Sequence, residues 1–231
     1  MTDSGVTDDS GVQTIPFYLV CDESGSMSGD PVEAVNEGIK QLCQTISRDP
    51  LVDDKARVGI ISFSDSAEVL LPLTQISQVG TIPACVTKGS TSYRAAFLKL
   101  KDEIDADVRN LKNNDAKVGR PVVFFISDGA PNPEDWLSAH TALVEEANPW
   151  RPHIISFGVA GAVRDVIHAV ATDVSRSGKR YAYLAEDGTN PGPALQEIMK
   201  FVTGSVVSSA RSNTPTIPEA QIDGVMIIDE L

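Results

Sequence analysis

Short apolar runs recur along the chain and predict a series of buried strands. The expected strands cover residues 16–21, 57–63, 67–71, 121–126, 153–159 and 180–184. The run at 121–126 (Pro-Val-Val-Phe-Phe-Ile) is the most apolar, which is typical of a central parallel strand covered on both faces. A Ser64-Asp65-Ser66 turn joins the second and third runs, so the strand at 67–71 is predicted to pair antiparallel at one edge of the sheet.

Between these runs, apolar residues recur three or four positions apart and predict helices. The expected helices cover residues 30–48, 93–111, 133–144, 163–171 and 194–206. Asp30-Pro31 is a helix start, with Asp30 as the N-cap and Pro31 at the first helical position. Strands that alternate with helices predict an α/β fold: a doubly wound, mostly parallel central sheet with one antiparallel edge strand and helices on both faces, as in Rossmann-like domains.

The chain length and the distribution of polar residues predict one domain with two appendages. Of the 231 residues, 1–14 are mostly small and polar and are expected to form a flexible N-terminal tail. The domain spans 15–209, and 210–231 form a C-terminal extension in which Pro215 and Pro218 interrupt any helix. The segment from Gly224 to Glu230 is expected either to add a strand to a sheet edge, of this molecule or of a partner, or merely to pack on its own domain.

The charge balance excludes some classes of partner. Lys and Arg number 19 against 32 Asp and Glu, a net charge of −13, which argues against binding to nucleic acid or to an anionic membrane surface. The polar start after Met1 and the lack of a long apolar run predict a cytoplasmic protein with no membrane insertion. The cysteines at 21, 43 and 85 are expected to be buried thiols, and the three histidines show no metal-binding spacing.

One polar stretch after the first strand carries candidate chemistry. In Asp22-Glu23-Ser24-Gly25-Ser26, one carboxylate and two hydroxyls alternate, so in a looped backbone Asp22, Ser24 and Ser26 can converge on one point. Such hard oxygen donors are the ligands that Mg²⁺ and Mn²⁺ prefer. Taken alone, the stretch is equally typical of an ordinary strand-to-helix turn with Ser and Asp as caps.

Two further positions are expected at the same edge of the sheet. Asp128 lies just past the central strand, and Thr91 lies in a Gly-Ser-Thr loop that opens a helix. Ligands gather at the carboxyl ends of parallel strands in such sheets. Two ionised carboxylates close together repel each other unless a cation lies between them. Two carboxylates and three hydroxyls would form an incomplete octahedron for Mg²⁺, completed by water or by a ligand.

These motifs together resemble the metal-ion-dependent adhesion site of the von Willebrand factor A-domain family. The elements match that family from about residue 15 to residue 207. The resemblance implies that Ser24, Ser26 and Thr91 bind the metal directly, and that Asp22 and Asp128 bind it directly or through water. In that family a carboxylate from a protein partner often completes the metal shell.

The sequence departs from the family pattern at two positions. The loop reads Gly-Ser-Thr where a second glycine is common, so Ser90 or Ser92 is an alternative to Thr91. Ser127 precedes Asp128 where threonine is frequent. The stretch from Phe17 to Met27 is also similar to a bacterial cytoplasmic branch associated with tellurium-resistance gene clusters.

The leading hypothesis is therefore a non-catalytic protein-interaction module that depends on Mg²⁺, or on Mn²⁺ or Ca²⁺, with a protein partner that donates an acidic side chain. One alternative is a Mg²⁺-dependent phosphoryl or ester hydrolase, and another is the same fold with a purely structural metal. Nucleotide binding is disfavoured because no Gly-x-Gly-x-x-Gly follows a strand. Residues next to the predicted ligands either rim the site or form ordinary helix starts and loops: Tyr93, Arg94, Pro131, Asn132 and Glu134.

Overall fold

The computed structural model describes residues 13–159, 161–173, 180–186, 190–217 and 221–228. Of the predicted N-terminal tail, residues 1–12 lie outside this part of the chain, and so do residues 229 and 230 of the C-terminal segment. Gln13 and Thr14, the last two residues of that tail, form the start of the first strand.

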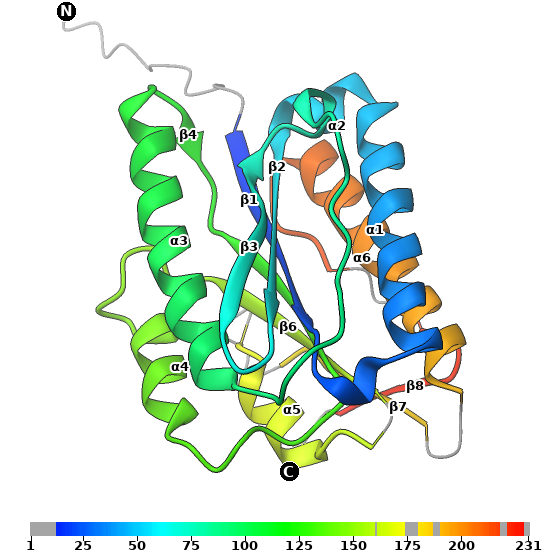
Figure 1. The fold of residues 1–231 in the computed structure, drawn as a ribbon. Coiled ribbons are helices and arrows are strands. Elements are labelled where there is room, and N and C mark those ends of the chain that lie inside the picture. The colour runs from blue at the N-terminus through cyan, green and yellow to red at the C-terminus, as the bar shows by residue number, and fades with distance from the viewer. Residues whose placement is uncertain (1–12, 160, 174–179, 187–189, 218–220, 229–231) are drawn as a thin grey trace, which may run out of the picture.

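In the described part of the chain, a mixed sheet of eight strands forms the centre of the molecule and confirms the predicted fold class (Figure 1). The neighbouring strands follow the order β3-β2-β1-β5-β6-β7-β8, and the short β4 pairs with the start of β1. β1, β2, β5, β6 and β7 run parallel, whereas β3 and β8 run antiparallel at the two edges. The strands are β1 (Gln13–Asp22), β2 (Ala56–Phe63), β3 (Ala67–Thr74), β4 (Lys117–Val118), β5 (Val122–Ser127), β6 (His153–Gly158), β7 (Ala182–Ala185) and β8 (Val225–Ile227).

Helices cover both faces of this sheet. In Figure 1, α1 and α6 lie on one face and α3 and α4 on the other. The helices are α1 (Asp30–Ser47), α2 (Pro50–Lys55), α3 (Tyr93–Asn113), α4 (Trp136–Val144), α5 (Arg164–Val170) and α6 (Pro191–Ser212). The parallel strands β2, β1, β5, β6 and β7 are neighbours in the sheet, so their carboxyl ends form one continuous edge between the two helix layers.

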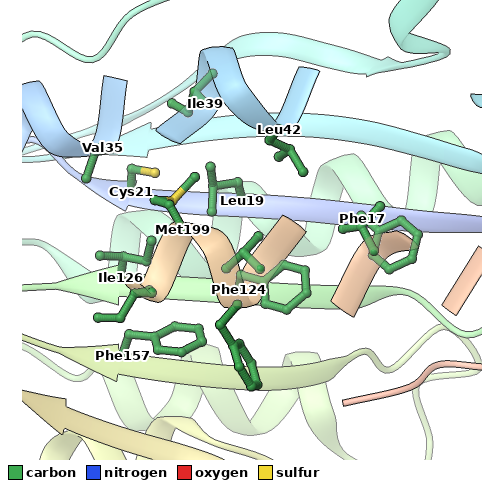
Figure 2. Close-up of a cluster of buried hydrophobic side chains, with 14 of the residues drawn as sticks. Phe17, Leu19, Cys21, Val35, Ile39, Leu42, Phe124, Ile126, Phe157 and Met199 are labelled. Atoms are coloured by element: carbon green, nitrogen blue, oxygen red, sulfur yellow. The ribbon is translucent and has the colours of Figure 1, made fainter. Parts of the chain in front are cut away.

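The side chains of β1 explain why a continuous apolar run forms a central strand. Phe17 and Leu19 point into the cluster under α1 and α6, whereas Tyr18 and Val20 point into the cluster under α3 and α4. Figure 2 shows the first cluster, where α1 contributes Val35, Ile39 and Leu42 and α6 contributes Met199. Both faces of β1 are therefore buried, as the sequence predicts. All three cysteines are buried free thiols, which confirms that prediction.

Two glycines determine where helix α1 begins and how closely it packs. Helix α1 approaches α6 so closely that a Cβ on Gly38 would lie 2.3 Å from Cγ of Met199. Gly29 is the N-cap of α1 at φ 83°, and Asp30 is the first helical residue, so the predicted cap at Asp30 is one position too late. A positive φ is a conformation that glycine adopts at little cost, which explains why the chain turns there.

The sheet has a second antiparallel edge strand, so the prediction of one such strand is incomplete. The C-terminal segment adds β8 to the edge of β7, and Ile228 then donates a backbone hydrogen bond of 2.8 Å to the carbonyl of Ala182. Val225 and Ile228 are buried, which gives this segment an apolar reason to pack on its own sheet.

Two short elements and one helix start were also mispredicted. Helix α2 was not expected, although Asp49 caps it by accepting hydrogen bonds from the backbone N–H of Leu51 and Val52. The two-residue β4 was too short to give a periodic signal. Helix α4 begins at Trp136 instead of residue 133, because Asp135 is its N-cap and accepts from the N–H of Ser138.

Candidate metal centre

The carboxyl ends of β1 and β5 bring the predicted metal ligands to one place. Asp22 is the last residue of β1, and Asp128 directly follows β5, the neighbouring parallel strand. Ser24 and Ser26 lie in the single turn of 3-10 helix that follows β1. The loop that ends at Thr91 crosses beside them, because the N–H of Gly25 donates to the carbonyl of Gly89 over 3.2 Å.

Two hydroxyls and one carboxylate of this set are in direct contact. The Oγ atoms of Ser24 and Ser26 lie 3.1 Å apart. Both donate to Oδ1 of Asp128, over 3.4 Å from Ser24 and 2.9 Å from Ser26. Ser24 and Asp128 are buried, whereas Ser26 is exposed. The cluster therefore opens to solvent on the side of Ser26.

Asp22 lies next to this cluster, and each of its two carboxylate oxygens accepts a hydrogen bond. Its Oδ1 accepts a 2.8 Å hydrogen bond from the N–H of Ser24, and its Oδ2 accepts a 2.6 Å bond from Oγ of Ser127. Ser127 is fully buried and orients Asp22 from the end of the neighbouring strand. Sequence reasoning noted Ser127 only as a substitution for threonine and missed this role, although a hydroxyl next to a predicted ligand was the signal.

Thr91 lies next to the same cluster without bonding to it. A Cβ on Gly129 would lie 3.5 Å from Oγ1 of Thr91, so this hydroxyl faces the backbone just after Asp128. The backbone carbonyl of Thr91 accepts a 2.8 Å hydrogen bond from the N–H of Asn132, which ties the two loops together. No hydrogen bond joins the Thr91 hydroxyl to the other four predicted ligands in the described part of the chain.

The two alternatives to Thr91 have other partners. Oγ of Ser90 donates to Asp65 and accepts a 2.9 Å hydrogen bond from Nδ2 of Asn132. Oγ of Ser92 donates to Oε1 of Glu134 over 2.7 Å and accepts the N–H of Ala95 as the N-cap of α3. The geometry therefore favours Thr91 as the hydroxyl available to a ligand.

The loop that holds Thr91 depends on two acidic residues that sequence reasoning did not single out. Asp65 approaches Gly89, which has φ +63°, and accepts from the N–H of Ser90 over 3.1 Å. Buried Glu23 accepts the N–H of Val86 over 2.8 Å and lies 3.6 Å from Nζ of Lys88. Glu23 lies within the stretch from Asp22 to Ser26, but it makes these contacts only because the loop with Val86 and Lys88 crosses beside that stretch.

The residues proposed for the rim are placed differently from one another. Tyr93 is fully buried, and its hydroxyl donates to the carbonyl of Gly129 over 3.3 Å. It therefore contacts the backbone next to Asp128 from the interior of the protein. Arg94 is exposed, and its N–H donates to Glu134 over 3.2 Å. Glu134 and Asn132 therefore organise the loops around the start of α3.

Burial makes both carboxyl groups harder to ionise. Burial raises the pKa of Asp22 to about 6, against the lowering effect of the hydrogen bonds from Ser127 and Ser24, and Asp128 raises it further. Burial also raises the pKa of Asp128, although the hydroxyls of Ser26 and Ser24 lower it. A bound cation would favour the ionised form of both groups.

The donor set fits a hard divalent cation. Oδ2 of Asp128 is buried and has no hydrogen-bond partner among the described residues, which is unusual for a buried carboxylate oxygen. Within the described ranges, no group of three His, Cys, Asp or Glu side chains comes together to hold a metal. Two carboxylates and three hydroxyls are instead all oxygen donors, as Mg²⁺, Mn²⁺ and Ca²⁺ prefer.

Comparisons with known proteins agree with this architecture. A family model, the von Willebrand factor type A domain, matches residues 17–130, which include all five predicted ligands. No curated protein matches the chain.

Solved structures resemble the chain over most of its length. A von Willebrand factor type A protein from Catenulispora acidiphila aligns with a TM-score of 0.57 at 15% identity, over 84% of this chain and 43% of that one. This is a von Willebrand factor type A fold. Proximal thread matrix protein 1 from the mussel byssus gives 0.57 at 18% identity, over 85% and 48% of the two chains.

The pilus adhesin SpaC from Lactobacillus rhamnosus GG gives a TM-score of 0.65 at 13% identity, over 86% of this chain and 30% of that one. The chain thus spans less than half of the length of each of these three structures. Within the described residues, no helix combines the length and the apolar character needed to span a membrane.

Proposed function

We propose that this von Willebrand factor type A domain is a non-catalytic, divalent-metal-dependent protein-interaction module. Ser24, Ser26 and Thr91 would bind the cation directly, and Asp22 and Asp128 would bind it directly or through water. The cation, Mg²⁺ or else Mn²⁺ or Ca²⁺, would supply an electrophilic centre to which a carboxylate of a protein partner binds. The domain would run from residue 15 to 209, with 210–231 as an extension of it.

The observation that carries this proposal is the buried, unpaired Oδ2 of Asp128 beside two hydroxyls. An ionised carboxylate oxygen without a hydrogen bond is costly in a protein interior, and a cation would offset that cost. Ser26 is exposed while Ser24 and Asp128 are buried, so a cation held there would have one side open to a ligand. Such an opening is what binding to a partner requires.

The names of the structural neighbours support an interaction role. SpaC is a pilus adhesin, and the mussel protein is a thread matrix protein. At such low sequence identity, the likeness shows only a shared fold. The transfer of an interaction role to this protein is therefore part of the proposal.

The first test is Mg²⁺ binding by isothermal titration calorimetry, with the thermal unfolding temperature measured in parallel. Asp128→Asn keeps the size of the side chain but removes the charge, and we expect it to lower Mg²⁺ affinity by at least about 100-fold. Asp102→Asn is the matched control, because Asp102 is exposed on α3. Equal affinity in both variants, with both folded, would place the metal elsewhere.

The second test asks whether the metal serves a partner or only the fold. Lysate from the native host is passed over the immobilised protein with Mg²⁺ or with EDTA, and over Asp128→Asn with Mg²⁺. We expect a protein retained only by the wild type with Mg²⁺. Unfolding in EDTA at ordinary temperature would instead favour a purely structural metal.

A third test addresses the hydrolase alternative. Generic phosphate and ester substrates are incubated with Mg²⁺ and either the wild type or Asp22→Ala. We expect no turnover in either case, and turnover that the variant lacks would contradict a non-catalytic role.

We also propose a biological setting for this module. The likeness of residues 17–27 to a bacterial branch found with tellurium-resistance genes supports a cytoplasmic role in a stress or tellurium-resistance system. Deletion of the gene in the native host, followed by growth on tellurite, tests this setting, and unchanged growth would contradict it.

A further inference from the structure

Three arginines lie in equivalent positions at the opposite edge of the sheet. Arg120, Arg151 and Arg180 each lie two residues before the first residue of a parallel strand, namely β5, β6 and β7. These three strands are neighbours in the sheet, so the arginines follow one another along its amino edge. The predicted metal ligands Asp22 and Asp128 lie at the carboxyl ends of β1 and β5.

All three arginines line one cavity of about 600 Å³. Its other walls come from the last turns of α4 and from the segment after α5, including the hydroxyl-bearing Thr141 and Thr172. A second cavity of about 330 Å³ adjoins it and shares Arg120 and Arg151. The three arginine residues are only partly exposed, so their charges are less screened than those of free surface side chains.

Backbone carbonyls hold these guanidinium groups in place. Nε of Arg120 donates to the carbonyl of Arg151 over 2.8 Å, and Nη2 donates to that of Pro152 over 3.3 Å. Nη1 of Arg151 donates to the carbonyl of Glu146 over 3.1 Å, and Nη1 of Arg180 to that of His168 over 3.4 Å. Carbonyl groups are neutral, so these bonds orient the guanidinium groups and leave their charge in place.

Carboxylates also line the cavity and reduce its positive charge. Oε1 of Glu146 lies 3.9 Å from Nη2 of Arg151, but the Glu146 side chain is 92% exposed, which makes this ion pair weak. Asp173 is the other carboxylate in the lining. Among the described residues, the lining of the cavity therefore holds three arginines and two carboxylates, in a chain whose net charge is −13.

The arginines also act on the pKa values of the histidines in this region, in addition to burial. Burial lowers the pKa of His153 to about 4, and Arg120 and Arg151 lower it further against the raising effect of Asp173. Burial also lowers the pKa of His140 and of His168, and Arg180 lowers both of them further. Positive charge from the three arginines thus disfavours a proton at three neighbouring sites.

We propose that this arginine cavity binds a phosphate monoester group. A planar guanidinium matches phosphate oxygens in pairs, and a doubly charged phosphate matches a surplus of positive charge better than a carboxylate does. The group can belong to a small molecule or to a phosphorylated side chain of a protein. This site would act independently of the metal centre, which lies at the other end of the strands.

Titration of the ¹⁵N-labelled full-length protein, followed by NMR, tests the site directly. Inorganic phosphate, the tripeptide alanyl-phosphoseryl-alanine, its unphosphorylated form and succinate are added separately in EDTA at constant ionic strength. We expect saturable shifts of the backbone amide signals of residues 119, 120, 151, 153 and 171–173 with phosphate and with the phosphorylated tripeptide only. Tighter binding of the tripeptide would identify a phosphorylated protein segment as the source, and tighter binding of inorganic phosphate a small molecule.

Two variants separate the cavity from general surface charge. Arg180→Gln is expected to weaken phosphate binding by at least about fivefold, as the loss of one charge-assisted hydrogen bond would. Arg164→Gln, an exposed arginine at the start of α5, removes the same charge and should stay within about twofold. Unchanged thermal unfolding checks that both fold.

Three results would overturn the proposal. One is the absence of saturable binding in the millimolar range, and another is equal loss in Arg180→Gln and Arg164→Gln. The third is equal binding of succinate, which would make the cavity a general anion site. Asp128→Asn should leave phosphate binding unchanged, so failure here and failure of the metal proposal are separate results.

Discussion

The two ends of the parallel strands in this protein carry opposite chemistry. At the carboxyl ends, carboxylates and hydroxyls bond to one another, and Asp22 and Asp128 are almost fully buried. At the amino ends, arginines bond to backbone carbonyls around an open cavity. Because parallel strands all point the same way, residues before and after them are sorted to opposite edges, and each edge can gather one kind of charge.

The comparison also separates two ways of holding a charged side chain. The carboxyl edge relies on side-chain hydroxyls and on tight loop crossings, so single substitutions there should disturb several contacts at once. The amino edge relies on separate anchors for each arginine, so substitutions should act one at a time. Four predictions test this difference, from the largest expected effect to the smallest.

The loop crossing at Gly89 should be the most sensitive point. A Cβ there would lie 2.3 Å from Oδ2 of Asp65, and the φ of +63° disfavours any other residue. Gly89→Ala should lower the free energy of unfolding by about 3 kcal/mol in a urea titration and weaken Mg²⁺ binding. Gly80→Ala is the control, because no atom lies within 4 Å of the added Cβ. Equal effects would contradict the role of this crossing.

At the amino edge, His153 should make the free energy of unfolding of the protein fall in acid. Its pKa is about 4 in the folded protein against 6.5 for an ordinary histidine, so the unfolded chain binds the proton more readily. The neutral histidine therefore contributes stability that is complete above pH 6.5 and is lost as the pH falls toward 4.

Comparison of the wild type with His153→Gln isolates this contribution. Between pH 7 and pH 5, the wild type should lose about 2 kcal/mol more unfolding free energy than the variant does. Urea titrations at the two pH values measure it, with His168→Gln as a control at a less buried histidine. If the unfolding free energy of His153→Gln depends on pH as that of the wild type does, His153 is not the source of this loss.

Ser127 should matter to the metal centre without binding metal. Its hydroxyl donates to Oδ2 of Asp22 over 2.6 Å, so Ser127→Ala should weaken Mg²⁺ binding by about tenfold in calorimetry. Ser156→Ala, on the neighbouring strand β6, removes an equally buried hydroxyl, which donates to the carbonyl of Ile167 in α5. If both variants weaken Mg²⁺ binding equally, the effect is on the fold and not on Asp22.

The smallest effect is expected at the rim of the arginine cavity. Glu146→Gln removes a highly exposed carboxylate near Arg151, and phosphate should then bind about twofold more tightly. Glu145→Gln, one residue earlier and outside the lining of this cavity, is the control. Weaker phosphate binding in Glu146→Gln would mean that Glu146 positions Arg151 through more than its backbone carbonyl.

Much of the fold was readable from local patterns. The apolar runs predicted six of the strands, and the antiparallel pairing of β3 follows from the short turn after β2. Helix α2 was missed although Asp49-Pro50 repeats the start signal of Asp30-Pro31, because six residues give no periodic stripe. The edge strand β8 was left open between several pairings, since three residues in an apolar segment carry no register.

The sequence by itself determined which residues carry oxygen donors and that they follow buried parallel strands. From this the five candidate ligands could be named, because strand direction alone places Asp22 and Asp128 at one edge. The tertiary structure decided their surroundings: Ser127 bonds to Asp22, Asp65 lies against Gly89, and Oδ2 of Asp128 has no hydrogen-bond partner among the described residues. It also decided that Arg120, Arg151 and Arg180 line one cavity, since residues so far apart in the chain come close only when strand order is fixed.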